Sequence, residues 1–356
     1  QLLDAMENIQ NTVQYSWLIE LAQMLFGFEA DRLTSDNWQP LAEAVEEKAA
    51  EDNRARAVLD ASNLKCTFLT NEFDEDLSDV DTSMFIPSLR ADTLVFKLAD
   101  RGVADRLAEA SGVEIGGGTD VRRAVKALAA KFNGWGARSA AISTPPQFCA
   151  PQVDDADYDA AVRKMLTGQE LSCQEQCTLQ SGTIHAVAEG CRETGMPFQI
   201  MYGAVRGAYP HGVYQGQDLP QGGDTIAGLL PLLNAYPDVT FCLSVLSDSQ
   251  IHELNSYGWI LQNVVLSGHW WYSTIPAYIQ RDLAARVQSV PGNKLIGYYS
   301  DMYKLEFGLA KFNMYRRVMA ATLAREFVEP GYGTEEQAVE LARDMLKGNA
   351  SRIFGI

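Results

Sequence analysis

The stretch KLIGYYSDMYKLEFGLAKFNMYRR, residues 294–317, decides the fold that the sequence predicts. Its apolar run 295–299 is typical of a buried strand, and Asp301 follows where that strand should end. Apolar residues then recur at helical spacing, which predicts a long amphipathic helix. They are Phe312, Tyr315, Met319, Leu323 and Phe327. Ligands of parallel α/β folds bind at the carboxyl ends of strands, so Asp301 is a candidate site residue; a simple loop cap is the open alternative.

Further apolar runs alternate with helical patterns and predict a parallel sheet. The candidate strands are 64–70, 86–96, 138–143, 198–204, 239–246, 264–272 and 295–299. We predict an α/β fold, a (β/α)₈ TIM barrel with helical insertions, as one domain over residues 1–356. The first strand of the barrel is missing from this count, and we expect it to precede Gln1.

Three other segments complete the predicted domain. Residues 97–136 form a helical insertion. Residues 147–170 form a long polar loop with a helix near 158–165. Residues 334–347 form a C-terminal helix, because Thr334 and Gln337 match a capping box.

Composition limits the classes of partner. The chain has 356 residues and a net charge of -17, which excludes electrostatic binding to nucleic acid or to an anionic membrane. No apolar run reaches the roughly 18 residues that a membrane span needs. None of the six cysteines forms a CxxC pair, so we expect reduced, mostly buried thiols and a cytoplasmic protein.

Several side chains at predicted strand ends suit the binding of a sugar-type or acyl substrate. Arg206 offers a planar fork for a carboxylate, and Trp270 and Trp271 offer flat apolar walls. Asp301 could bind a metal or move a proton, and His269 lies nearby in sequence. Two alternatives stay open: Arg206 pairs with a loop acid, or the tryptophans only fill the mouth of the barrel.

Three motifs now point to a family. FQIMYGAVRG (198–207), SGHWWY (267–272) and GYYSDMYKLEFGLAKFNMYRR (297–317) occur in the order and spacing of motifs in the uronate isomerases. The chain thus resembles this branch of the amidohydrolase superfamily. The resemblance implies a (β/α)₈ barrel with helical insertions. It also implies aldose–ketose isomerisation of hexuronates such as glucuronate or galacturonate, usually with one bound divalent metal.

The resemblance also assigns roles to residues. Asp301 is implied as metal ligand or proton-transfer group, and Arg206 as the substrate carboxylate contact. Gln199, Trp270 and Trp271 are implied as further substrate contacts, with zinc or manganese as the metal.

The motifs also depart from the family pattern. The family's His-x-His pair lies on a strand that this chain does not contain. Met201 stands where the family has His, and Tyr303 stands where it has Arg. A thioether cannot replace an imidazole as a ligand of hard metals or as a base.

These departures keep two alternatives open. One is a metal-dependent hydrolase or lyase on the same barrel, with His269 and Tyr303 as catalytic residues. The other is a barrel that binds a sugar acid without turning it over. The isomerase and the binding barrel would take a small-molecule sugar acid as partner, and the hydrolase or lyase another small carboxylated substrate. Homo-oligomerisation stays open.

Overall fold

The structure is a computed structural model that describes residues 2–213 and 216–356. It divides into two compact units. The helical unit comprises Gln1–Thr67, His269–Ala284 and Tyr298–Ala338. The sheet unit comprises Phe68–Gly268, Ala285–Gly297 and Val339–Ile356.

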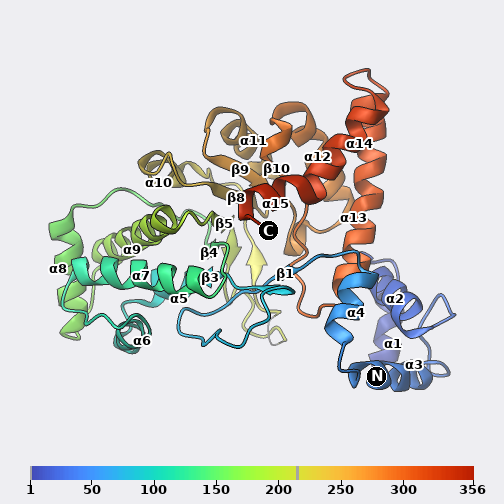
Figure 1. Ribbon diagram of the computed structural model, residues 1–356, viewed down its shortest axis with the longest axis horizontal. Coiled ribbons are helices and arrows are strands. Elements are labelled where there is room, and N and C mark those ends of the chain that lie inside the picture. Colours follow the sequence, from blue (N-terminus) through green and yellow to red (C-terminus); the bar gives the residue numbers. More distant parts are fainter. Residues whose placement is uncertain (1, 214–215) are drawn as a thin grey trace. The chain divides into compact units, whose positions relative to one another are not determined.

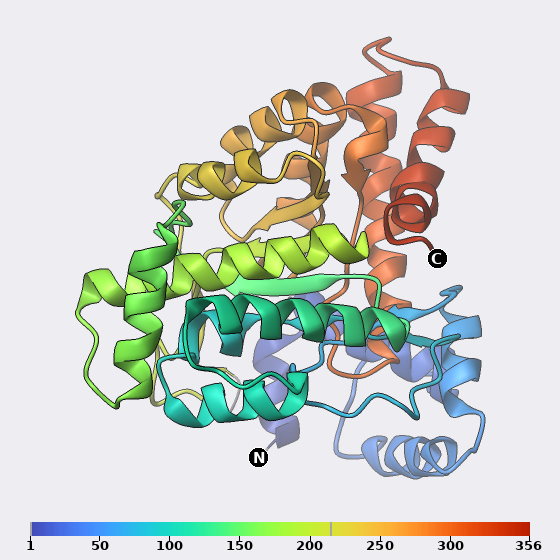
Figure 2. The same cartoon turned by 60° about the vertical axis from the view of Figure 1, so that its left-hand side comes forward.

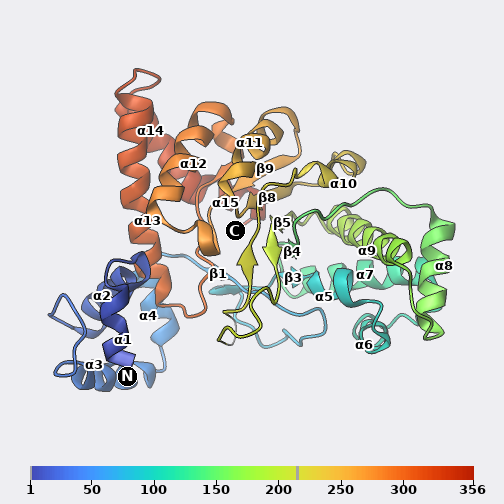
Figure 3. The same cartoon turned by 180° about the vertical axis from the view of Figure 1, so that it is seen from behind.

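A parallel sheet of six strands forms the centre of the sheet unit, in the order β10-β9-β8-β5-β4-β3 (Figure 1; Figure 3). The strands are β3 (Leu89–Arg90), β4 (Ala140–Thr144), β5 (Phe198–Tyr202), β8 (Phe241–Val245), β9 (Val264–Ser267) and β10 (Leu295–Ile296). All five neighbouring pairs are parallel and follow the order of the chain. Because parallel neighbours need crossover connections, this order confirms the predicted alternation of strands and helices.

Burial explains why these strands form. Every residue of β4, β8 and β9 is buried, as expected for strands covered on both faces. Phe198 and Phe241 are fully buried and lie opposite each other in the β5–β8 register. Each such ring contributes about 1.5–3 kcal/mol by leaving water.

Helices surround the sheet within this unit. They are α5 (Asp92–Lys97), α6 (Arg101–Ser111), α7 (Gly118–Gly134), α8 (Asp155–Leu166), α9 (Cys173–Thr194), α10 (Leu230–Ala235), α11 (Ile251–Ile260) and α15 (Asn349–Phe354). The helices α7 and α9 lie side by side (Figure 2). Gly190 permits this approach, because a Cβ there would come within 2.8 Å of the Ala129 Cβ.

The helical unit contains α1 (Leu2–Met6), α2 (Val13–Phe26), α3 (Trp38–Ala49), α4 (Arg54–Ala61) and α13 (Phe307–Leu323). The helix α2 begins at a Thr12 cap and ends at Gly27, which adopts the left-handed conformation that its φ of 67° requires. The helix α13 packs against α2, where Arg317 Nη2 lies 2.9 Å from Glu20 Oε2 (Figure 1). The unit boundary falls within α12 (Pro276–Ser289) and α14 (Glu335–Arg343).

Several predicted strands are shorter than expected. Only Thr67–Phe68 of the first one forms β1, which pairs with β2 (Phe85–Ile86) outside the main sheet. The strand predicted over 86–96 is wrong in its second half, where α5 begins at Asp92. An acidic side chain in the first turn stabilises a helix N-terminus, which outweighs the apolar strand-like composition.

The strands β9 and β10 also end early, for local reasons. Trp271 has a φ of 49°, which no strand residue adopts, so the strand predicted to reach 272 cannot continue. The amide of Gly297 donates to the Met345 carbonyl at 2.8 Å instead of to a neighbouring strand, so β10 stops at Ile296.

Other predicted segments are confirmed or extended. The helical insertion is α6 with α7, and the loop 147–170 contains α8. The Thr334–Gln337 capping box is present, and the C-terminal helix continues through a π-helical turn, Asp344–Gly348, into α15.

All six cysteines are free, but Cys149, Cys173 and Cys177 are exposed, so the expectation of mostly buried thiols is wrong.

The pairings of the described strands do not include one that would close the sheet into the predicted barrel. The pairings described over residues 2–213 and 216–356 form a run of six parallel strands, and a bridge from Asn71 to Leu89 continues it beyond β3. In the same ranges, none of the helices has the length and apolar character needed to cross a membrane.

Candidate functional site

Asp301 lies on a left-handed turn of the helical unit. Its φ is 46°, a conformation that costs a residue with a Cβ about 1–2 kcal/mol and that aspartate tolerates better than most. The residue is exposed, and it lies beyond the end of β10 rather than directly at it. Tyr303, two residues later, is 74% exposed. The turn therefore presents a carboxylate to solvent on a strained backbone.

A buried lysine contacts the backbone of this turn. Lys311, on α13, donates from Nζ to the Ser300 carbonyl at 2.6 Å and to the Asp301 carbonyl at 3.0 Å. Its ammonium also lies 5.1 Å from the centre of the Trp17 ring. Burial lowers the pKa of Lys311, and the negative charge of Asp301 opposes that shift.

His269 and Asp282 form a buried pair in the same unit. His269 Nε2 lies 2.8 Å from Asp282 Oδ2, and the side chains are 3% and 5% exposed. The imidazole ring also lies 6.0 Å from the Tyr315 ring. The structure thus places His269 in the packed interior beside a carboxylate, and its catalytic role stays a prediction.

Aromatic rings surround the segment that leads to Asp301. Trp270 lies 5.8 Å from Trp271 and 6.4 Å from Tyr299, in a stacked arrangement with the latter. Tyr298 stacks on Tyr315 at 4.6 Å. Burial raises the pKa of Tyr298, with further contributions from Tyr315 and the charge of Asp301. Within the described residues, Trp270 Nε1 and Tyr298 Oη are buried without a hydrogen bond. Such unsatisfied polar atoms are unusual in a protein interior.

Arg206 lies in the sheet unit, after β6 (Ala204–Val205), which pairs with β7 (Leu219–Pro220). Its Nη1 donates to Asp218 Oδ2 at 2.6 Å, as the loop-acid alternative predicted, and Asp92 Oδ1 lies 3.9 Å from Nη2. Burial acts to raise the pKa of Asp218, but hydrogen bonds from Arg206 and the Gly207 amide together hold it below its ordinary value. The Arg206 side chain is 52% exposed, so it remains accessible.

Gln199 and Met201 are both half-buried residues of β5. Gln199 Nε2 donates to Ser139 Oγ at 2.9 Å, near the start of its strand. Arg206 lies beyond the other end of β5, so the structure does not bring Gln199 and Arg206 together. The predicted substrate contact of Gln199 stays a prediction.

The predicted site residues therefore fall into two groups. The helical unit holds Asp301, Tyr303, His269, Trp270 and Trp271, and the sheet unit holds Arg206 and Gln199.

Sequence reasoning missed the side chains that support the first group, above all Lys311 and Asp282. A lysine four residues before Tyr315, on the apolar stripe of an amphipathic helix, was the available signal for Lys311. Asp282 offered no comparable pattern.

The residues described do not fit a protein-held metal centre. Over residues 2–213 and 216–356, no group of three or more His, Cys, Asp or Glu side chains is placed to hold a metal ion. Met201 supplies a thioether where a hard cation needs oxygen or nitrogen, and His269 faces Asp282. Of the predicted site residues, Asp301 offers exposed carboxylate oxygens.

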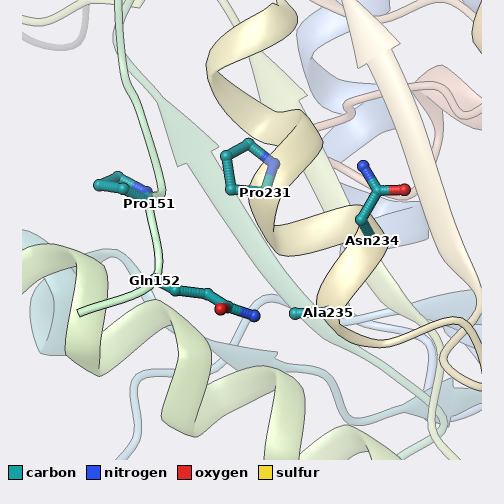
Figure 4. A pocket seen from close by; sticks show the side chains of 5 residues that line it. All are labelled: Pro151, Gln152, Pro231, Asn234 and Ala235. Carbon is teal, nitrogen blue, oxygen red and sulfur yellow. The ribbon is translucent and has the colours of Figure 1, made fainter. Parts of the chain in front are cut away.

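Two hollows of the sheet unit lie apart from every predicted site residue. The first has a volume of about 420 Å³ and is lined by Pro151, Gln152, Pro231, Asn234 and Ala235 (Figure 4). The second, of about 280 Å³, includes His185, whose Nδ1 lies 3.2 Å from Tyr236 Oη. Its polar side chains pair with one another, for example Arg122 with Glu189 at 2.8 Å. This pairing is typical of packing, and His185 itself is buried.

Comparison with known proteins decides the family. The model of the glucuronate isomerase family matches residues 3–354. The chain belongs to this family. The prediction made from the three sequence motifs is thus confirmed.

Individual members of the glucuronate isomerase family are distant. The uronate isomerase of Mesorhizobium japonicum is 25% identical over 259 residues, which cover 70% of this chain and 55% of that protein. The uronate isomerase of Cutibacterium acnes is 22% identical over 377 residues, covering 100% of this chain and 79% of that protein. The crystal structure of the Thermotoga maritima uronate isomerase matches with a TM-score of 0.89 at 18% identity, covering 98% of this chain and 80% of that one. At this identity the structural match establishes the fold.

Proposed function

We propose that this chain catalyses the aldose–ketose isomerisation of a hexuronate such as glucuronate or galacturonate. The observation that carries the proposal is the family match over residues 3–354, which includes the segment around Asp301. The relatives are longer than the matched segment, so the activity is proposed for this chain and tested directly.

The reaction moves one hydrogen from C2 to C1 of the sugar, and one proton from the C2 hydroxyl oxygen to the C1 oxygen. A group that accepts and returns a proton must reach these atoms. We assign this role to the exposed carboxylate of Asp301. The rings of Trp270 and Trp271, whose centres lie 5.8 Å apart, suit the apolar face of the sugar ring. Arg206 suits the carboxylate of the substrate, in exchange for Asp218.

Two finer points belong to the same proposal. The six parallel strands, which follow the order of the chain, would form the larger part of a (β/α)₈ barrel. The site would lie at the carboxyl ends of these strands. One zinc or manganese ion would contact Asp301. Because the described residues supply no ligand set for it, no step of the reaction is assigned to the metal.

The test is to incubate the protein with glucuronate or galacturonate, with and without zinc or manganese, and to follow ketose formation by NMR. We expect a ketose product and no product of hydrolysis. Binding of the sugar acid without any product would overturn the isomerase and support the binding barrel. Cleavage of another carboxylated substrate would support the hydrolase or lyase. Metal analysis of the same sample shows whether the protein retains a divalent ion.

The proposal also covers where the enzyme works and what it binds. Six thiols without a disulfide fit a reducing cytoplasm, and a net charge of -17 fits a small-molecule partner rather than nucleic acid or a membrane surface. Cell fractionation tests the first point. Light scattering tests whether the protein forms a homo-oligomer.

A further inference from the structure

The ammonium group of Lys311 is enclosed by groups of its own unit. The residue is 8% exposed. Two of its N–H groups face the consecutive carbonyls of Ser300 and Asp301, and the Trp17 ring lies 5.1 Å from Nζ. A buried ammonium without acceptors is very unfavourable, so these two carbonyls are the groups that make its burial tolerable.

We propose that Lys311 is a positioning residue that fixes the direction in which the Asp301 side chain leaves the backbone. The inference rests on the proposed function, in which the carboxylate of Asp301 contacts the sugar. Lys311 itself acts only through the backbone of the turn. It would set the direction of the Asp301 Cα–Cβ bond, without contacting the substrate.

The backbone geometry gives the physical reason. Successive carbonyls of an extended chain point in opposite directions. Here the carbonyls of Ser300 and Asp301 both face one nitrogen atom, and the φ of 46° at Asp301 allows them to converge. Two fixed peptide planes on either side of a Cα also fix its Cα–Cβ bond. The contacts of Lys311 thereby determine the direction in which the Asp301 side chain leaves the backbone.

The same helix supports the segment just before the turn. Tyr315 lies one turn beyond Lys311 on α13, and its ring stacks on Tyr298 at 4.6 Å. The helix therefore contacts both the approach to the turn and the turn itself. Loss of Lys311 should loosen the turn while this aromatic contact keeps the rest of the segment in place.

The sheet unit offers a matched control. Lys294 Nζ donates to the carbonyls of Gly258 and Leu261, at 3.0 and 2.6 Å. These carbonyls belong to the C-terminal end of α11, where a cation is stabilising. Like Lys311, Lys294 satisfies two backbone carbonyls with one ammonium, but it contacts no predicted site residue.

The first experiment compares Lys311→Met, Lys311→Arg and Lys294→Met in steady-state isomerisation. We expect Lys311→Met to lower kcat by about 10- to 100-fold, because misplacement of a catalytic group by about 1 Å costs this much. KM should stay nearly unchanged, since the substrate contacts remain. Lys311→Arg keeps N–H donors and should restore most of kcat. Lys294→Met should keep wild-type kcat.

The second experiment needs no activity. Hydrogen exchange of the peptide spanning 298–306 should be about tenfold or more faster in Lys311→Met than in wild type, because charged hydrogen bonds to the turn are lost. In Lys294→Met this peptide should exchange as in wild type, and exchange should rise at the end of α11 instead.

The two experiments separate the two proposals. An inactive wild type with faster exchange in Lys311→Met would overturn the proposed function and keep the positioning role. An active wild type with equal kcat losses in Lys311→Met and Lys294→Met would overturn the positioning role. Unchanged exchange of 298–306 in Lys311→Met would also overturn it.

Discussion

The turn at Asp301 and the turn at Arg206 differ in how they are held. Each places a charged side chain after a strand, and each was predicted as part of the site. The Asp301 turn is fixed by the buried ammonium of Lys311, whereas Arg206 is held by an ion pair to Asp218 and is 52% exposed. Interactions of buried charges have large consequences when one partner is lost, while exposed ion pairs contribute about 0–1 kcal/mol.

The difference assigns different tasks to the two residues. A fixed carboxylate suits proton transfer, in which the donor and acceptor atoms must keep a defined distance. An accessible guanidinium with a replaceable partner suits the binding of a substrate carboxylate. Changes in the helical unit should therefore affect kcat or folding strongly, and changes at Arg206 should mainly affect binding.

The largest expected effect is that of Asp301→Asn. It removes the group that we assign to proton transfer, so kcat/KM should fall by about 10²–10⁴-fold. Asparagine also tolerates the left-handed conformation, so the fold should stay intact. Steady-state kinetics and circular dichroism measure the two outcomes. Unfolding together with the loss of activity would show that Asp301 has a structural role instead.

The next effect is on stability. Asp282→Asn replaces the carboxylate beside the buried His269 ring with a neutral amide, and loss of a buried hydrogen-bond partner typically costs about 1–3 kcal/mol. Urea denaturation measures this loss. The matched comparison is the double variant His269→Phe with Asp282→Leu, which should cost less than the two single replacements added together because the residues are in contact. If Asp282→Asn lowered the free energy of unfolding by less than about 1 kcal/mol, the pair would contribute no more than an exposed ion pair does.

Arg206→Ala should act mainly on substrate binding. Because a charged hydrogen bond is lost, KM for a hexuronate should rise by about tenfold or more, with a smaller change in kcat. The neutral analogue, an aldohexose without the carboxylate, should show little change in affinity. Isothermal titration with both sugars measures the difference. Equal losses for the two would rule out a role of Arg206 in binding the carboxylate.

Sequence patterns predicted most of the sheet unit because burial acts on periodic side chains. The fully buried strand β8 lies within the predicted run 239–246. The strand β4, also fully buried, overlaps the predicted run 138–143 and ends one residue after it. The ends of strands were harder to predict, because single contacts determine where a strand stops. The Gly297 amide bound to Met345 ends β10, and the positive φ of Trp271 prevents extension of β9 to 272.

The candidate site was predictable only in part. Asp301, His269 and the tryptophans follow recognisable strand motifs, so their types and order are visible in the chain. Their supports are not visible: Lys311 and Asp282 lie on helices, and each contacts a residue outside its own helix, where helical spacing gives no signal. No local pattern shows that Asp218 would pair with Arg206, since acids are common in glycine-rich loops.

The smallest expected effect concerns pH and Asp218. Its pKa is lower in the folded protein than its ordinary value, so the carboxylate stabilises the fold at pH values above about 4, the unfolded pKa. This contribution is lost as pH falls through the folded pKa. Asp218→Asn should therefore cost at most about 1 kcal/mol near pH 7, and the difference from wild type should shrink toward pH 3. Urea denaturation at several pH values measures it.

The same variant tests whether Arg206 is available to a substrate. With Asp218 neutral, a hexuronate carboxylate no longer competes with an internal one, so KM should fall while stability changes little. The control is Asp155→Asn, since Asp155 is 90% exposed beside Arg122 and lies away from Arg206. If Asp218→Asn instead raised KM, Asp218 would orient Arg206 for binding rather than compete for it. The exposed turn would then be held in place like the turn at Asp301, with an acid in the role of Lys311.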